Sequence, residues 1–290
     1  MNYIITGSEG FIGKNLIKSI KEHNNWSHKE KNTKIISIDS KVNQEKNTYY
    51  IIGHVENINE FAETFFNRTN ITLYHLAAMS SPVEVADQPF EAIKSNLLGT
   101  AAVLEFARRK NILHTIIASS SAVTGRSLYG WTKKSSEYLA EYYMKHHKLN
   151  VAYCRFFNTF GNNENKGKWT SIPTQFLDKA MKDENIIIYG NGKQSRDFIY
   201  IKDLVEWLWS LHENKRTSRF DFGTGISTSY NSLAEMIIRL TNSKSKIIHI
   251  KNPLKNYQTF TKASFPYSTP KYTLETALQD MINERRILNE

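Results

Sequence analysis

Cysteine is almost absent from this sequence. The 290 residues include one cysteine, Cys154, which lies in the apolar run that begins at Val151. A lone cysteine cannot form an internal disulfide, so the sequence favours a reducing compartment, the cytoplasm, over a secreted, disulfide-stapled scaffold. We interpret Cys154 as a buried core thiol rather than as a nucleophile.

Long apolar runs are also missing. No run approaches the length of a membrane span, and the N-terminus shows neither a basic leader nor a cleavage-type end. We therefore expect no membrane contact and no signal peptide. Apolar residues make up 40% and charged residues 23% of the chain, which is typical of a soluble globular protein large enough to bury a core.

Acidic residues are outnumbered by basic ones, and the formal net charge is +10. Such a charge attracts anions, including phosphorylated metabolites. The lysines and arginines are scattered, with no long basic block and no nucleic-acid motif, so we expect no nucleic-acid partner. The histidines show no metal-ligand spacing, and we expect no metal.

Short apolar segments alternate with helical patterns through the first 160 residues or so. This alternation predicts an α/β fold with a doubly wound parallel sheet of the Rossmann type. The predicted strands are residues 2–6, 34–39, 49–53, 71–76, 113–118 and 151–157, and the predicted helices are 14–20, 57–66, 89–109 and a segment starting near 129.

The alternation weakens after residue 158. We predict a first domain over residues 1–170 and a smaller, interleaved α/β lobe over 171–290, with 195–225 returning to the first domain. After residue 170 we predict helices at 173–182 and 232–240 and strands at 186–189 and 220–223.

Three glycines mark a candidate cofactor site. Gly7, Gly10 and Gly13 lie between the first strand and the first helix, where glycines let the backbone approach a pyrophosphate and the helix N-terminus supplies N–H donors. Asp39 ends the second strand, where an acid accepts hydrogen bonds from ribose hydroxyls and repels a 2′-phosphate. We therefore predict NAD as the cofactor, while Lys41 nearby keeps NADP open.

Tyr129 and Lys133 form a candidate catalytic pair. They are four residues apart, and therefore on one face, in a segment that reads as the start of a helix. An ammonium beside a phenol favours the phenolate, which can take a proton from a sugar or alcohol hydroxyl near neutral pH. An ordinary solvated helix can show the same spacing, so the spacing indicates a catalytic pair only if the neighbouring residues also fit one.

Seven sequence blocks, in chain order, resemble the extended short-chain dehydrogenase/reductase family, the nucleotide-sugar epimerases and dehydratases. The blocks are 6–13 (TGSEGFIG), 75–78 (HLAA), 96–100 (NLLGT), 119–125 (SSSAVTG), the Tyr129–Lys133 pair, 155–161 (RFFNTFG) and 190–203 (GNGKQSRDFIYIKD). They span most of the chain. The resemblance implies bound NAD, a nucleotide-diphosphate-sugar substrate and a place in carbohydrate metabolism, such as cell-surface polysaccharide synthesis.

The resemblance also implies roles for single residues. Tyr129 would be the general base, Lys133 its tuner and a nicotinamide-ribose contact, and Ser120 the partner of the reacting hydroxyl. Further cofactor contacts would be Phe11, Ile12, His54, Val55, Leu76, Ala77, Ala78, Asn96 and Phe156. Substrate contacts would be Ser80, Ser121, Asn158 and Arg196, the last two at the diphosphate.

The implied reaction is an epimerisation, most simply at C4. Tyr129 would remove the hydroxyl proton while hydride passes to NAD, and hydride would then return to the opposite face of the keto-sugar. Family dehydratases carry an acidic pair, and decarboxylases usually a glutamate, where this chain has Ser121 and Ala122. Open alternatives are a dehydratase or reductase, an ADP-heptose-type 6-epimerase suggested by residues 255–263, and a non-catalytic NAD- or nucleotide-sugar-binding protein.

Some positions depart from the family pattern. Only Arg126, Ser127 and Leu128 separate Gly125 from Tyr129, so we expect an open sugar pocket on that side. Other departures are Thr124 in place of a tyrosine, His54 in place of an acid, and no evident second diphosphate-binding arginine, with Lys255 as a possible stand-in.

The two long predicted helices point to a partner. Helices 89–109 and 131–147 resemble the pair that family members use for a two-fold, four-helix interface. We therefore expect a homodimer through these helices.

Overall fold

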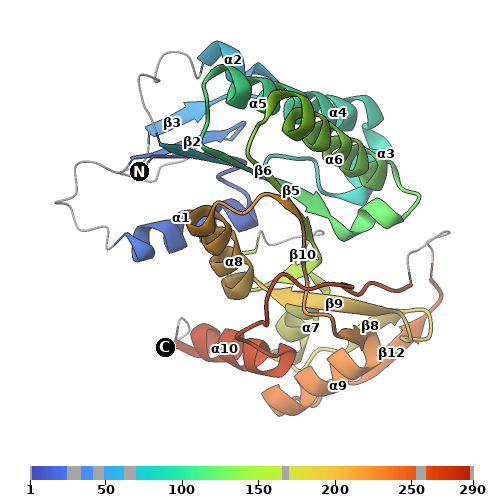
Figure 1. The fold of residues 1–290 in the computed structure, drawn as a ribbon. Coiled ribbons are helices and arrows are strands. Elements are labelled where there is room, and N and C mark those ends of the chain that lie inside the picture. The colour runs from blue at the N-terminus through green and yellow to red at the C-terminus, as the bar shows by residue number, and fades with distance from the viewer. Residues whose placement is uncertain are drawn as a thin grey trace. The chain divides into compact units, whose positions relative to one another are not determined.

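The computed structural model of the chain describes residues 2–24, 34–41, 49–61, 70–164, 170–252 and 259–287. The chain divides into two compact units (Figure 1). The first contains Met1–Arg155 and Val205–Phe220, and the second contains Phe156–Leu204 and Asp221–Glu290. The chain thus leaves the first unit after Arg155 and returns to it for one stretch.

A seven-stranded sheet forms the centre of the first unit, with strand order β10-β6-β5-β4-β1-β2-β3. The pairs β1–β2, β1–β4, β2–β3 and β4–β5 are parallel. The strands are β1 (Asn2–Thr6), β2 (Lys34–Asp39), β3 (Tyr49–Ile52), β4 (Ile71–His75), β5 (His114–Ser120), β6 (Val151–Phe156) and β10 (Ser218–Phe222). This arrangement confirms the predicted α/β fold.

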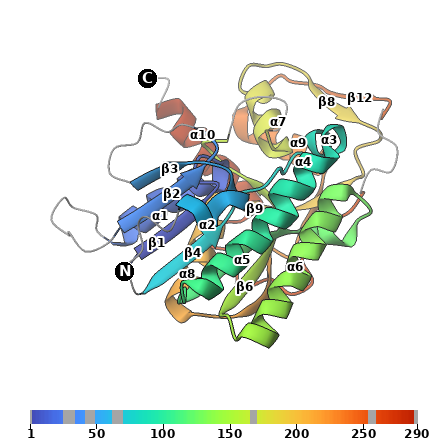
Figure 2. The ribbon, with the colours of Figure 1, turned by 90° about the horizontal axis from the view of Figure 1, so that it is seen from above.

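Helices cover both faces of this sheet. Helices α4, α5 and α6 lie on one face, and α1 and α8 lie on the other (Figure 1). Figure 2 shows α5 and α6 side by side, and the two helices are in contact. The helices are α1 (Phe11–His23), α2 (Ile58–Phe61), α3 (Pro82–Asp87), α4 (Pro89–Ile93), α5 (Gly99–Arg109), α6 (Leu128–His147) and α8 (Ile201–Asn214).

Two predicted helices differ in detail. The helix predicted at 89–109 is continuous, but a π-helical turn at Lys94–Leu98 joins α4 to α5. The helix predicted at 57–66 begins as α2, and residues 62–69 lie outside the described residues. Within the described ranges, no helix is both long and apolar enough to span a membrane.

The core of the first unit explains why its strands read as apolar runs. All of β4 and all of β5 except Ser120 are buried, because helices on both faces cover both sets of side chains. Ile4, Leu73 and Ile117 from the sheet pack with Leu104 and Phe106 of α5. The sheet therefore presents a fixed carboxyl edge, where ligands of open α/β sheets bind.

Two small sheets and three helices make up the described part of the second unit. A three-stranded sheet has the order β11-β9-β7, and β8 pairs with β12. The elements are β7 (Asn158–Phe160), α7 (Ile172–Ala180), β8 (Ile186–Tyr189), β9 (Ser195–Tyr200), β11 (Ser227–Ser229), α9 (Tyr230–Thr241), β12 (Ile247–Ile250) and α10 (Leu274–Ile287). Lys202 anchors α10 through Asp280 at 2.6 Å and Glu284 at 2.7 Å.

Candidate active site

The glycine turn between β1 and α1 leaves no room for side chains. Gly7 has a φ of +72°, and a Cβ there would lie 2.6 Å from the backbone nitrogen of Ala77. A Cβ on Gly13 would lie 2.3 Å from the carbonyl oxygen of Gly7. Gly10 precedes α1, and no side chain caps the helix, which is the arrangement that receives a phosphate.

Asp39 is held at the end of β2 beside this turn. Its Oδ2 accepts a hydrogen bond from the backbone N–H of Glu9 at 2.9 Å, and its Oδ1 accepts one from the N–H of Lys41 at 3.0 Å. The Tyr50 hydroxyl donates to the carbonyl oxygen of Lys41. Burial, with the negative charges of Asp39 and Glu9, raises the pKa of Tyr50 to about 12. The glycine turn and this carboxylate together fit a nucleotide cofactor.

The end of β4 lies against the same turn. Leu76 donates its N–H to the carbonyl oxygen of Thr6 at 3.1 Å, and Ala77 donates to Thr6 Oγ1 at 3.3 Å. His75 Nδ1 lies 2.8 Å from Thr6 Oγ1, and its Nε2 lies 3.1 Å from Thr100 Oγ1. Burial, with a smaller effect from Lys133, lowers the pKa of His75 to about 3, so His75 is neutral.

Asn96 lies in the π-helical turn and joins three segments. Its Oδ1 accepts from the N–H of Met79 at 2.8 Å, and its Nδ2 donates to the carbonyl oxygen of Met79 at 3.0 Å and to Thr132 Oγ1 at 3.2 Å. Isolated π turns are frequent at functional sites. Asn96 therefore ties the segment after β4 to α6.

The three predicted catalytic residues come together between the end of β5 and the start of α6. Ser127 caps α6 by accepting the N–H of Gly130 at 3.1 Å. The Tyr129 hydroxyl is hydrogen-bonded with Ser120. Lys133 is 4% exposed, and its Nζ donates to the carbonyl oxygen of Ala118 at 2.8 Å.

The pKa of Tyr129 differs from the sequence-based expectation. Burial raises it, and the hydrogen bond with Ser120 opposes this increase. The expected lowering by Lys133 is not seen, because burial dominates and the ammonium is directed to Ala118. Burial also lowers the pKa of Lys133 to about 8.

A buried charged network beside this pair was not predicted from the sequence. Glu137 is 1% exposed, and it accepts from Arg155 Nε and Nη2 at 2.7 Å each. Ser119 Oγ donates to Glu137 Oε1 at 2.6 Å. The sequence did contain a signal for Glu137, because Glu137 follows Lys133 by four residues, as Lys133 follows Tyr129, and all three therefore share one helical face.

The remaining residues of the first unit that were predicted to bind cofactor or substrate differ in how deeply they are buried. Phe11 and Ile12 open α1 and are partly buried, and Ala78 is partly buried after β4. His54 is exposed, whereas Val55 is buried and packs so closely on α5 that a Cβ on Gly99 would lie 2.5 Å from its Cγ1. Ser80 is exposed after β4, and Ser121 begins the 3-10 turn that follows β5.

Phe156, Asn158 and Arg196 belong to the second unit. Phe156 packs on Phe222, with ring centroids 5.7 Å apart. Asn158 Nδ2 donates to the carbonyl oxygen of Asp197 at 3.0 Å and to Thr261 Oγ1 at 2.9 Å. The Arg196 side chain donates to the carbonyl oxygen of Ser195 at 2.8 Å, and its guanidinium lies 5.8 Å from the centroid of the Tyr230 ring. Lys255 lies outside the described residues.

Sequence comparison relates the chain to known enzymes. UDP-glucuronic acid decarboxylase 6 of Arabidopsis thaliana is 27% identical over 275 residues, which cover 87% of this chain and 78% of that protein. UDP-glucuronic acid decarboxylase 1 of Danio rerio is 28% identical over 270 residues, which cover 84% and 62% of the two chains.

Structural comparison gives the same fold. UDP-glucose 4-epimerase of Thermotoga maritima superposes with a TM-score of 0.88 at 21% identity over 100% of both chains. UDP-N-acetylglucosamine 4-epimerase of Methanobrevibacter ruminantium superposes with a TM-score of 0.86 at 20% identity, over 99% of this chain and 98% of that one.

The family profile described as "NAD dependent epimerase/dehydratase family" matches residues 3–222. That range contains the glycine turn, Asp39, Ser120, Tyr129 and Lys133. It confirms the family and the cofactor, NAD, that the sequence blocks predicted. The chain belongs to the NAD dependent epimerase/dehydratase family.

Proposed function

We propose that this protein is an NAD-dependent epimerase that inverts C4 of a nucleotide-diphosphate sugar through a keto-sugar intermediate. The observation that carries the proposal is the joining of Tyr129, Ser120 and Lys133 where β5 meets α6. A phenol hydrogen-bonded to a serine, with a buried ammonium one turn further along the helix, suits proton removal from a sugar hydroxyl.

The cofactor would lie along the glycine turn. The pyrophosphate would meet Gly10 and the N-terminus of α1, and Asp39 would face the adenosine ribose. Bound NAD supplies a hydride acceptor that later returns the hydride. Tyr129 takes the hydroxyl proton and gives it back, and Ser120 orients the reacting oxygen.

The residues after Ser120 favour epimerisation over loss of water. Ser121 and Ala122 form the start of a 3-10 turn, and neither side chain can act as a carboxylic acid or carboxylate. Glu137 is the buried acid of the neighbouring network, and hydrogen bonds from Arg155 and Ser119 already engage both of its oxygens. Acid–base elimination therefore lacks an obvious proton donor and acceptor at these positions.

Decarboxylation is the second candidate, because the curated sequence relatives include UDP-glucuronic acid decarboxylases. A 4-keto uronate is a β-keto acid, which can lose carbon dioxide without a dedicated acid residue. The same Tyr129 chemistry would serve this reaction.

In the second unit, Arg196 and Asn158 are our proposed diphosphate contacts. A guanidinium presents a charged fork that suits phosphate oxygens, and Arg196 is oriented by Ser195 and Tyr230. Replacing Arg196 with methionine should raise KM for the nucleotide sugar far more than it lowers kcat. An unchanged KM would remove Arg196 from the substrate site.

A panel of nucleotide sugars tests the proposal. Purified protein with NAD would be incubated with UDP-glucose, UDP-N-acetylglucosamine and UDP-glucuronic acid, and the products separated by chromatography and mass spectrometry. A product of unchanged mass and new retention time supports epimerisation, and a product lighter by carbon dioxide supports decarboxylation. An inactive protein that retains NAD would support the non-catalytic alternative.

We also propose a cytoplasmic location. Cys154 is a free, buried thiol, and burial raises its pKa well above the usual value, so it is poorly suited to redox chemistry. Fractionation of cells that produce the protein would test this proposal, and recovery outside the cytoplasm would contradict it.

A further inference from the structure

One face of α6 forms a series of hydrogen bonds with the end of β5. Tyr129 is hydrogen-bonded with Ser120, Lys133 donates to the carbonyl oxygen of Ala118 at 2.8 Å, and Glu137 accepts from Ser119 at 2.6 Å. The three helix residues are four apart, so they share a face. Three consecutive residues of β5 are thus each tied to α6.

Glu137 is the member of this series that no step of the proposed chemistry uses. It lies one helical turn after Lys133 and is almost completely buried. Arg155 of β6 binds it through two bonds of 2.7 Å, and Lys134 lies 3.3 Å from its Oε2. Despite burial, which alone would raise it, the pKa of Glu137 is lowered by the hydrogen bonds from Arg155 and Ser119, so the carboxylate is ionised.

Stability alone is a weak explanation for such a group. Removing two charges from water costs free energy that their attraction often does no more than offset, and apolar replacements are frequently as stable. A buried ion pair does have a strict geometric demand, because a bidentate guanidinium–carboxylate contact is planar and directional. The network therefore fixes where α6, β5 and β6 meet.

We propose that Glu137 is a positioning residue, which sets the register of α6 against the end of β5 and so holds Tyr129 and Lys133 opposite Ser120. Arg155 neutralises and orients the Glu137 carboxylate. Ser119 donates a hydrogen bond to that carboxylate, so the position of Glu137 also fixes the position of the next residue, Ser120. A shift of the helix by one residue, about 1.5 Å, would break all three contacts. The inference rests on the proposed function, since it assigns a task to residues around that catalytic pair.

The chain offers a matched control on the same two elements. Glu141 follows Glu137 by one turn on α6 and accepts from the Tyr153 hydroxyl of β6 at 2.5 Å. This contact joins the same helix to the same strand but does not reach β5. Glu141→Gln should therefore affect stability without affecting the catalytic pair.

The test compares Ser119→Ala, Glu137→Gln and Glu141→Gln by steady-state kinetics. We expect kcat to fall about tenfold to a hundredfold in Ser119→Ala and Glu137→Gln, with KM for the nucleotide sugar nearly unchanged. Glu141→Gln should keep the wild-type kcat. Ser119→Ala leaves the Glu137–Arg155 pair intact, so it decides the question even if Glu137→Gln fails to fold.

A second measurement does not depend on turnover. Proteins labelled with 13C at the tyrosine ζ carbon would be titrated by NMR, with the Tyr129 signal assigned from its loss in Tyr129→Phe. The shift and titration of this signal should change in Ser119→Ala and Glu137→Gln and not in Glu141→Gln. An inactive wild type with these NMR changes would refute the proposed function alone.

Wild-type kcat and an unmoved Tyr129 signal in both Ser119→Ala and Glu137→Gln would overturn the positioning role, whatever their stability. Equal losses in all three variants would also overturn it, because the effect would then be one of general packing.

Discussion

The Lys133 ammonium lies 2.8 Å from the carbonyl oxygen of Ala118, buried beneath the start of α6. The hydrogen bond of the Lys133 ammonium is thus directed to the end of β5. Tyr129 and Lys133 are one helical turn apart along α6, and burial lowers the pKa of Lys133 to about 8. The charge that supports the proposed phenolate is itself close to its titration range.

Stability should depend on the protonation of Lys133. Its pKa is about 8 when folded and about 10.5 when unfolded, so the unfolded chain binds more protons between these values. The free energy of unfolding should therefore rise with pH across this window, by up to about 3 kcal/mol from this residue. Lys133→Met should reduce that rise, as measured by urea unfolding at pH 7.5 and 10. An identical pH dependence in both proteins would contradict the burial of a charged Lys133.

Buried neutral histidines should make the protein sensitive to acid. Burial lowers the pKa of His212 to about 4 and that of His75 to about 3, and it also lowers the pKa of His114. In the unfolded chain these groups titrate near 6.5. Between pH 6.5 and 4 the unfolded chain therefore binds more protons, and stability should fall as pH falls.

His212→Gln should lessen this acid sensitivity. His212 contacts Thr72 through Nδ1 at 2.9 Å, and its replacement removes one proton-binding group whose folded pKa is lowered. The loss of unfolding free energy between pH 7 and 4.5 should shrink by about 2 kcal/mol relative to wild type. Urea unfolding at both pH values measures it, and an equal loss in both proteins would refute this role of His212.

Gly13→Ala should abolish NAD retention. The added Cβ would lie 2.3 Å from the carbonyl oxygen of Gly7, so the cofactor turn must move. Gly10→Ala is the matched comparison, because its Cβ would lie 3.2 Å from the same oxygen and requires a smaller shift of the backbone. NAD released on denaturation of each purified variant would be quantified. Equal NAD content in Gly13→Ala and wild type would contradict the proposed pyrophosphate turn.

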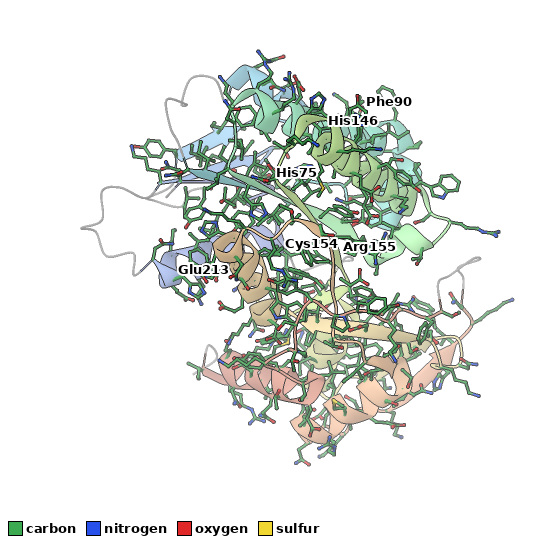
Figure 3. The ribbon with its side chains drawn as sticks, in the orientation of Figure 1. His75, Phe90, His146, Cys154, Arg155 and Glu213 are labelled. Carbon is green, nitrogen blue, oxygen red and sulfur yellow. The ribbon has the colours of Figure 1, made fainter. Side chains whose placement is uncertain are left out.

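The helix layer of α4, α5 and α6 carries several exposed apolar side chains, and we propose that it forms the homodimer interface. Figure 3 labels Phe90 and His146 on this layer. Phe90 is 72% exposed and Trp131 is 58% exposed. Exposed apolar groups of this size on one layer are typical of an interface.

Charge on this layer should dissociate the dimer. Phe90→Glu with Trp131→Glu should give a monomer in light scattering after size exclusion, because charges would be buried without partners. Phe265→Glu in the second unit is the control, since Phe265 is 77% exposed but lies outside these helices. A wild-type monomer would refute the interface.

The central strands of the first unit were predictable because they are apolar runs buried on both faces, as β4 shows. The short strands of the second unit lack that signal: β9 reads SRDFIY, and its place depends on pairing with β7 and β11. Helix α10 is largely polar and was missed, because its position depends on contacts with Lys202, more than seventy residues away.

In the candidate site, too, the local patterns were predictable from the sequence and the long-range contacts were not. The glycine turn and the Tyr129–Lys133 spacing are local patterns, so the sequence contains them. The pairing of Glu137 with Arg155 is a long-range contact, and the direction of the Tyr129 pKa depends on burial, which spacing does not report. Both required the packing of α6 on β5 and β6.

Retention of hydrogen at the sugar carbon tests the proposed mechanism most directly. The nucleotide sugar that the protein turns over would be supplied with deuterium on C4, and the product examined by mass spectrometry and NMR. We predict that the deuterium stays on C4 of the epimer, that no reduced cofactor accumulates, and that Tyr129→Phe gives no product. Loss of deuterium to solvent, or turnover by Tyr129→Phe at the wild-type rate, would contradict hydride transfer dependent on Tyr129.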